Sequence, residues 1–223
     1  MKGACLMANF YLILDAFMCF LWIATYTLVL IGTLRYKYPL IAPLTQAIIA
    51  PFEFSVLLYF IKLSAFRFDY ASIAYLYWSM IEIAIIFVMI KKRYIQKKWI
   101  IPYIGAVVAL TILMVYFVII MGKMLFFSYA NTFVGVAVWM AFILKRKDYP
   151  INPFTLTVFC LKFLADILGG IVYFGKGHCL INILCVCLPI LDSVFIYIYL
   201  KKRAKKFELT FEMQASAREI HEM

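Results

Sequence analysis

The sequence is poor in the residues from which metal and nucleotide sites are usually built. Only two of its 223 residues are histidine, and its six cysteines show no paired C-x-x-C spacing. It also lacks a phosphate loop, a G-x-S-x-G elbow, an H-E-x-x-H motif and the acidic motifs D-x-D-D and D-D-x-x-D. Zinc hydrolysis, nucleotide hydrolysis and magnesium-assisted diphosphate ionisation are therefore not indicated, and we expect neither a metal nor another cofactor.

Charge is scarce as well. Charged residues make up 15% of the chain, hydrophobic residues make up 67%, and the mean hydropathy is +0.97. Soluble domains are roughly 45–50% apolar, so the expected solvent of this chain is a lipid bilayer. Hydropathy predicts seven membrane spans, at residues 10–34, 40–63, 70–90, 99–121, 125–144, 152–174 and 179–200. The alternating segments of a β-barrel are absent from the sequence, so we expect an all-α, seven-helix, multi-pass integral membrane protein.

The basic residues predict an orientation. Of the 22 Lys and Arg residues, 16 lie in the odd-numbered loops or the tail, which places the N-terminus outside and the C-terminus in the cytoplasm. We therefore divide the chain into a membrane domain, 1–200, and a basic cytoplasmic tail, 201–223. This topology accounts for most of the net charge of +11, so nucleic acid is not an expected partner. The segment "KKRAKK" is expected to contact anionic lipid headgroups instead.

Five acidic residues interrupt the predicted spans. They are Asp15, Glu53, Glu82, Asp166 and Asp192. An ionisable group at the centre of a bilayer costs on the order of 2.5–3.5 kcal/mol even on the mildest scale, so these side chains are expected to face the interior of the bundle. Glu53 and Asp192 each lie 13 residues into their spans, which places both near the membrane midplane.

Three of these acids have structural explanations. Asp166 follows Lys162 by one helical turn, so an internal ion pair is the favoured interpretation for both residues. For Glu82 a structural role, in which it accepts a hydrogen bond from Ser79, Tyr75 or a neighbouring helix, and a functional role are equally open. Asp15 lies closer to the outer surface, where it is expected to be hydrated.

The other two acids, Glu53 and Asp192, are the functional candidates. Neither has a basic residue within four positions on its own helix. Aromatic residues make up 18% of the chain, and ring faces attract cations by roughly 0.5–2 kcal/mol each. Several lie near the acids: Phe52, Phe54, Tyr59, Tyr75, Tyr77, Trp78, Phe195 and Tyr197. They either form an apolar cavity with electron-rich walls or serve as ordinary membrane packing residues.

Short motifs along the chain suggest a family. The second span has Glu53 directly after Phe52, with Tyr59 six positions later, and the last span contains Asp192 in "LPILDSVFIYIYLKK". The first span has Trp22 and Tyr26. In the third span Glu82 precedes "FVMIKKRYIQKKW", and in the sixth Lys162 precedes "LADILGG". With these features, the chain resembles the small seven-helix integral-membrane terpene cyclases of fungal meroterpenoid and bacterial terpenoid pathways.

The resemblance implies a cyclisation that starts by protonation. An acid protonates a terminal epoxide or alkene of a linear prenyl chain, and the rings close through carbocations. Glu53 would be the proton donor, Asp192 its partner, and Glu82 a third polar contact. Burial in apolar surroundings favours the neutral form of a carboxyl group, which suits Glu53 to that role. The residues expected to contact substrate are Glu82, Phe52, Tyr59, Tyr75, Trp78, Trp22, Tyr26 and Tyr197.

An epoxide is the favoured substrate group, because its oxygen is far more basic than an alkene and its opening releases ring strain. The lipophilic substrate is expected to enter from the bilayer, and an aromatic pocket would shield the cation from water. The main alternative is a proton-coupled transporter or channel in which the same acids form a relay. A relay predicts acids spread through the depth of the membrane, whereas a cyclase predicts acids around one closed apolar pocket. A non-catalytic receptor, with the acids as packing groups, is a third possibility.

Overall fold

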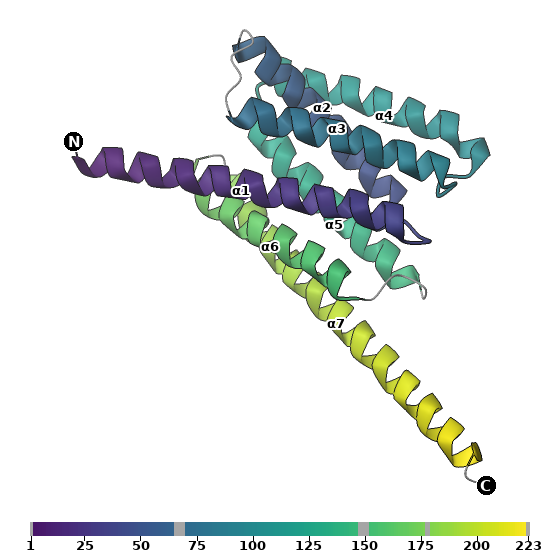
Figure 1. Cartoon of the computed structure of the whole chain (residues 1–223). Coiled ribbons are helices and arrows are strands. Elements are labelled where there is room, and N and C mark those ends of the chain that lie inside the picture. The colour runs from purple at the N-terminus through teal and green to yellow at the C-terminus, as the bar shows by residue number, and fades with distance from the viewer. Residues whose placement is uncertain (1, 65–69, 147–151, 177–178, 222–223) are drawn as a thin grey trace.

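The computed structural model describes residues 2–64, 70–146, 152–176 and 179–221 and is all-helical in this part of the chain (Figure 1). Its α-helices are α1 (Lys2–Arg35), α2 (Pro43–Ser64), α3 (Tyr70–Lys91), α4 (Ile100–Val115), α5 (Met124–Lys145), α6 (Pro153–Tyr173) and α7 (Cys179–His221). A 3₁₀ turn, Lys97–Trp99, precedes α4, and a π-helical turn, Tyr116–Ile120, extends it.

Seven of these elements are long and apolar enough to cross a membrane. The predicted seven-helix, multi-pass membrane fold is therefore confirmed. The orientation of the termini stays a prediction. The boundary placed at residue 200 has no counterpart in the secondary structure, because α7 continues without a break from Cys179 to His221.

Local sequence explains where several helices begin and end. Asn152 caps α6, since its side-chain oxygen accepts a hydrogen bond from the Thr155 amide at 2.9 Å, and Pro153 occupies the first turn, where no amide proton is needed. Gly122 has a φ of 63°, a left-handed conformation that glycine adopts without strain, at the turn between the π-helical segment and α5.

Lysine side chains satisfy carbonyl groups where two helices end. The ammonium group of Lys92 donates to the carbonyl oxygen of Leu34 in the last turn of α1. Lys202 donates to the carbonyl oxygen of Ile143 in the last turn of α5 at 2.8 Å. Both contacts place a positive charge at the negative end of a helix, and both lie at the end of the bundle that carries residues 36–42 and 92–96.

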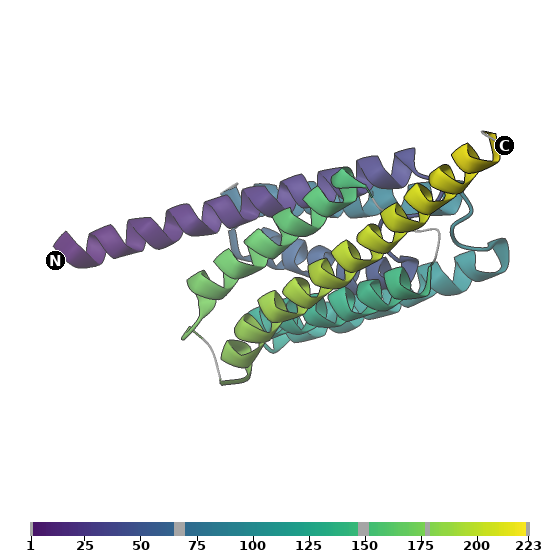
Figure 2. The ribbon, with the colours of Figure 1, turned by 90° about the horizontal axis from the view of Figure 1, so that it is seen from below.

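Six helices form a closed ring. Following the packed neighbours leads from α1 to α3, α2, α5, α7, α6 and back to α1. In Figure 2 the purple α1, the green α6 and the yellow α7 lie in front of the rest of this ring. The remaining helix, α4, lies outside the ring and packs on α2 (Figure 1).

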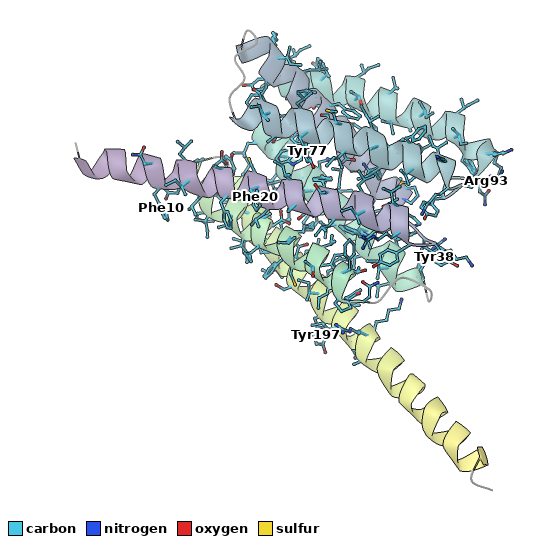
Figure 3. All side chains as sticks on the ribbon, viewed as in Figure 1. Phe10, Phe20, Tyr38, Tyr77, Arg93 and Tyr197 are labelled. Carbon is cyan, nitrogen blue, oxygen red and sulfur yellow. The ribbon has the colours of Figure 1, made fainter. Side chains whose placement is uncertain are left out.

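The outer surface of the bundle is apolar. Side chains project from the ring on all sides (Figure 3), and many of the exposed ones are large hydrophobic groups. On α4, Ile101 is 82% exposed. Such a surface suits lipid rather than water, as the membrane assignment requires.

Candidate functional site

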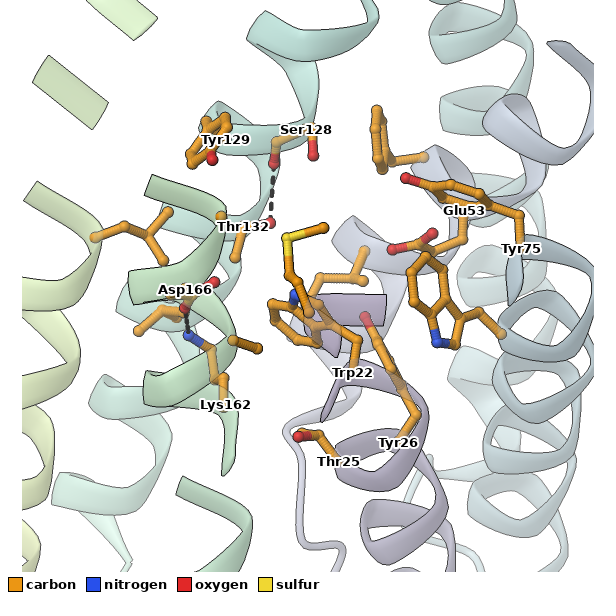
Figure 4. Close-up of a pocket in the computed structure, with 18 of the residues that line it drawn as sticks. Trp22, Thr25, Tyr26, Glu53, Tyr75, Ser128, Tyr129, Thr132, Lys162 and Asp166 are labelled. Carbon is orange, nitrogen blue, oxygen red and sulfur yellow. Dashed lines mark hydrogen bonds and ion pairs between the residues drawn. The ribbon is translucent and has the colours of Figure 1, made fainter. Parts of the chain in front are cut away.

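A partly enclosed cavity of about 120 Å³ lies within the ring. All six ring helices contribute to its wall, and α4 does not. The wall is mainly apolar and aromatic. It also contains two carboxyl groups, those of Glu53 and Asp166, and one amino group, that of Lys162. Figure 4 shows Glu53 on one side of the cavity and the Lys162–Asp166 pair on the other.

Glu53 stands alone among the acids of the cavity. It is buried, and its Oε2 atom has no hydrogen-bond partner among the described residues. Pro51, two residues earlier, lies inside α2 and has no amide proton, so the carbonyl of Ala47 loses its regular helical partner there. A buried carboxyl group without an ionic partner is more stable when protonated, and a protonated carboxyl group is a potential acid catalyst.

The opposite wall holds a three-membered ionic cluster. The Lys162 ammonium group donates to Asp166 on the same helix and to both carboxyl oxygens of Asp192 on α7, at 2.8 and 2.9 Å. All three side chains are buried. The predicted pairing of Lys162 with Asp166 is therefore confirmed, and the structure adds Asp192 as a second partner. With both aspartates ionised the cluster carries a net charge of −1.

Aromatic rings form much of the wall beside Glu53. The rings of Tyr75 and Trp78 lie 4.6 Å apart in an edge-to-face arrangement, and those of Trp22 and Tyr26 lie 5.7 Å apart. The ring of Tyr26, from the second pair, lies 6.5 Å from the ring of Trp78, from the first. In Figure 4 the Tyr26 hydroxyl group points toward Glu53. A cation formed in the cavity would meet the electron-rich faces or edges of several rings.

The cavity contains most of the aromatic residues that the sequence suggested. The wall includes Trp22, Tyr26, Phe52, Tyr75 and Trp78.

Two further aromatic candidates lie elsewhere. Tyr59 packs against Phe60, with ring centroids 5.9 Å apart, in a cluster around Phe52 and Val56. Tyr197 is 64% exposed on the outer side of α7, facing away from the bundle (Figure 3). The position of Tyr197 on α7 therefore turns it toward lipid and away from the cavity, and its contact with substrate stays a prediction.

The acids are distributed differently from the expectation. Asp192 is not among the residues that line the cavity, because Lys162 holds it between α6 and α7. Asp166 is the aspartate on the wall. Glu82 also lies behind the wall, fully buried and near the hydroxyl group of Tyr26, but without a hydrogen bond of normal geometry to the described residues.

Asp15 is half-buried and accepts a hydrogen bond from the Tyr173 hydroxyl group at 2.9 Å. Tyr173 itself lines the cavity. The expectation that Asp15 is a hydrated interfacial residue overlooked this partner on α6, which is 158 positions away in the sequence.

Sequence reasoning also missed the contribution of α5. Tyr129, Thr132 and Trp139 all line the cavity, and the indole nitrogen of Trp139 donates to the carbonyl oxygen of Leu40 at 2.8 Å. The fifth span contains no acidic residue, so nothing marked it as part of a site. Its buried polar residue, Asn131, was the available signal.

Among the described residues, no group of three or more His, Cys, Asp or Glu side chains is arranged to hold a metal ion. Comparison of the chain with protein-family models, with curated proteins and with solved structures gives no match. The functional argument therefore depends on the geometry of the cavity.

Proposed function

We propose that this protein is a membrane terpene cyclase that converts a linear, epoxidised prenyl chain into a cyclic isomer by protonation. Glu53 supplies the proton to the epoxide oxygen, and the carbon–oxygen bond opens as the nearest alkene attacks. Each ring closure moves the positive charge along the chain. Loss of a proton from carbon ends the reaction, so substrate and product have the same composition.

The observation that carries the proposal is the environment of Glu53. A buried carboxyl group with an unpartnered oxygen faces a cavity whose wall is rich in aromatic rings. The epoxide oxygen would give this carboxyl group the partner that it lacks. The rings stabilise the cation in a site where bulk water, which would quench it, has little access.

Glu53 donates a proton, whereas the ionic cluster across the cavity stabilises the positive charge that results. When both aspartates are ionised, the net charge of −1, with Asp166 at the wall, favours positive charge on the substrate. Asp166 is also placed to accept the final proton from carbon. Asp192 acts through Lys162, which it holds in position, and is a positioning residue in this scheme.

The size of the cavity constrains how substrate binds. At about 120 Å³ it is smaller than the roughly 300–1,000 Å³ of common ligand pockets. We infer that it receives the reacting end of the chain, while the remaining isoprene units displace wall side chains or extend between helices toward lipid. Met18 and Met124 on the wall are unbranched side chains of the kind that adapts to irregular space.

The test is a search for isomers of unchanged mass. Membranes containing the protein are supplied with farnesyl and geranylgeranyl compounds, each with and without a terminal epoxide, and the products are separated and weighed by mass spectrometry. We expect a new isomer from an epoxide, and none from membranes with Glu53→Gln or without the protein. Absence of any isomer across the panel, or equal product from Glu53→Gln, would refute the proposal.

A proton-coupled transporter is the second candidate. It is favoured by two of the three acids outside the cavity wall, Asp15 toward one end of the bundle and Glu82 behind Tyr26. Liposomes containing the protein and a pH-sensitive dye distinguish the two functions. Proton flux that depends on Glu53, without any isomer, would support the transporter.

A further inference from the structure

We propose that Glu82 and Gln46, together with interior water, form a proton path between Glu53 and the end of the bundle that carries residues 36–42 and 92–96. The inference rests on the proposed function, because it explains how Glu53 is reprotonated after each turnover. It assigns a role to two buried polar residues that do not touch the cavity.

The first observation is a set of polar atoms that lack partners deep in the protein. Gln46 and Glu82 are both 0% exposed. Neither the two amide atoms of Gln46 nor the two carboxyl oxygens of Glu82 make a hydrogen bond of normal length and angle with the described residues. A buried polar group left unsatisfied costs about 1–3 kcal/mol, so such groups generally have bound water or a functional reason.

The second observation is their alignment. Gln46 and Glu53 are seven residues apart on α2, so they lie on the same face of the helix, about 10 Å apart along its axis. Glu82 on α3 lies about 14 Å from the end of its helix at Lys91, and Glu53 lies about 15 Å from the start of α2, at the same end of the bundle. The two glutamates are therefore at nearly the same depth on packed helices.

The residues that interact electrostatically with Glu82 belong to three other helices. They are Glu53 on α2, Tyr26 on α1 and Tyr103 on α4. Tyr26 reaches the cavity wall, where its hydroxyl group points toward Glu53 (Figure 4). Glu82 is thus near two residues of the cavity wall, Glu53 and Tyr26, and within electrostatic range of Tyr103 on α4.

A surface hollow marks the outer end of the path. It has a volume of about 470 Å³, and its lining includes Pro43, Gln96 and Tyr103. The Tyr103 hydroxyl group donates to the carbonyl oxygen of Pro43 at 3.1 Å. Gln46 follows Pro43 on α2 by three residues, which is about one helical turn. The hollow is beside the basic segment 91–98, where water and headgroups are expected.

The reaction creates the need for such a path. Glu53 gives its proton to the epoxide oxygen, where it stays in the product as a hydroxyl group. The proton released from carbon passes to Asp166 on the far side of the cavity. Resetting the enzyme therefore requires one proton to reach Glu53 and one to leave Asp166. Delivery from behind Glu53 restores the acid without admitting water to the carbocation.

Infrared spectroscopy tests the path without substrate. The protein, in lipid nanodiscs, is transferred from H₂O to D₂O, and the shift of the carboxylic C=O band of Glu53 is followed in time. The band is assigned by its absence in Glu53→Gln. We expect Glu82→Gln and Gln46→Leu each to slow this exchange by roughly tenfold or more, the effect of losing one good partner in a buried network. Asp15→Asn, at the other end of the bundle, is the control and should leave the rate unchanged.

The outcomes separate this inference from the proposed function. Exchange at the wild-type rate in both Glu82→Gln and Gln46→Leu would overturn the path, even if isomers form in the product assay. Slowed exchange in Asp15→Asn alone would place proton entry at the opposite end and also overturn it. If Glu82→Gln does not fold, Gln46→Leu decides, since it removes only an uncharged amide. Absence of a Glu53 carboxylic band would show an ionised group and overturn both proposals.

Discussion

The two walls of the cavity hold their carboxyl groups in opposite ways. On α2, Glu53 has no ionic partner and an oxygen without a hydrogen bond. On α6, Asp166 shares the ammonium group of Lys162 with Asp192, and all three are satisfied. In a low-dielectric interior, an acid with a paired cation stabilises a particular packing of helices, whereas an unpaired acid is available for proton transfer. The contrast assigns architecture mainly to one wall and chemistry mainly to the other.

The largest effect, on the free energy of unfolding, should come from removing the positive charge of Lys162 on the α6 wall. Lys162→Met leaves Asp166 and Asp192 buried without a counter-charge, and breaking a buried pair in this way costs about 3–5 kcal/mol. The free energy of unfolding in mild detergent measures the loss. The triple variant Lys162→Met, Asp166→Asn, Asp192→Asn should recover most of it, and Glu53→Gln should cost little. A Lys162→Met protein as stable as the wild type would contradict the contrast between the walls.

Neutralising either aspartate should have a smaller effect, and one on turnover. In the form with both aspartates ionised, Asp166→Asn and Asp192→Asn each remove the net negative charge that faces the cation, so we expect each to lower the cyclisation rate by roughly 10–100-fold. Only Asp166→Asn should also change which alkene isomer forms, because Asp166 lies on the wall. Initial rates and product ratios measure both. Equal product ratios in the two variants would remove Asp166 as the proton acceptor.

A change in cavity volume should have a modest effect. A Cβ atom at Gly169 would lie 3.1 Å from the Tyr129 hydroxyl oxygen and 3.2 Å from the Met18 sulfur. Gly169→Ala should therefore reduce the rate with geranylgeranyl substrates more than with farnesyl substrates, with stability changed by about 1 kcal/mol. The matched control is Gly105→Ala on α4, where a Cβ atom meets nothing within 4 Å. If both variants shift the substrate preference equally, the volume of the cavity does not determine the preference for substrate chain length.

The smallest effect is expected at an aromatic residue on the lipid face. Tyr197→Leu should leave rate and products unchanged, because this side chain is 64% exposed on α7. Tyr75→Leu should alter the product ratio, since it removes a ring that packs at 4.6 Å against Trp78 in the wall. A larger change in Tyr197→Leu than in Tyr75→Leu would show that the aromatic wall does not guide the reaction.

The sequence was sufficient to predict where the helices lie along the chain, but not which face of each helix points into the bundle. Length and hydropathy predicted all seven spans, and spacing predicted the pair of Lys162 with Asp166, because both follow from local geometry. Tyr197 and Tyr199 show the limit. They are two residues apart, yet Tyr199 is fully buried and Tyr197 is largely exposed. Lipid tails are as apolar as a helix interface, so hydropathy does not reveal which face of a span points inward.

The same limit explains why the structure places some of the predicted site residues outside the cavity wall. Asp192 looked unpaired because its cation, Lys162, lies 30 positions away on another helix. Glu82 looked like a cavity residue because its depth is right, but Tyr26 stands in front of it. Depth is readable from the position along a span, whereas partners between helices depend on rotation and tilt. A polar residue in a predicted span therefore indicates which helix contributes to a site, but it does not indicate which residue of another helix it contacts.

The position of α4 outside the ring has a practical consequence. Because this helix supplies no side chain to the cavity, it is a suitable attachment point for a small apolar reporter dye or a spin label that reports from the lipid phase. Gly105, on its open face, is the position at which such an addition should disturb the protein least.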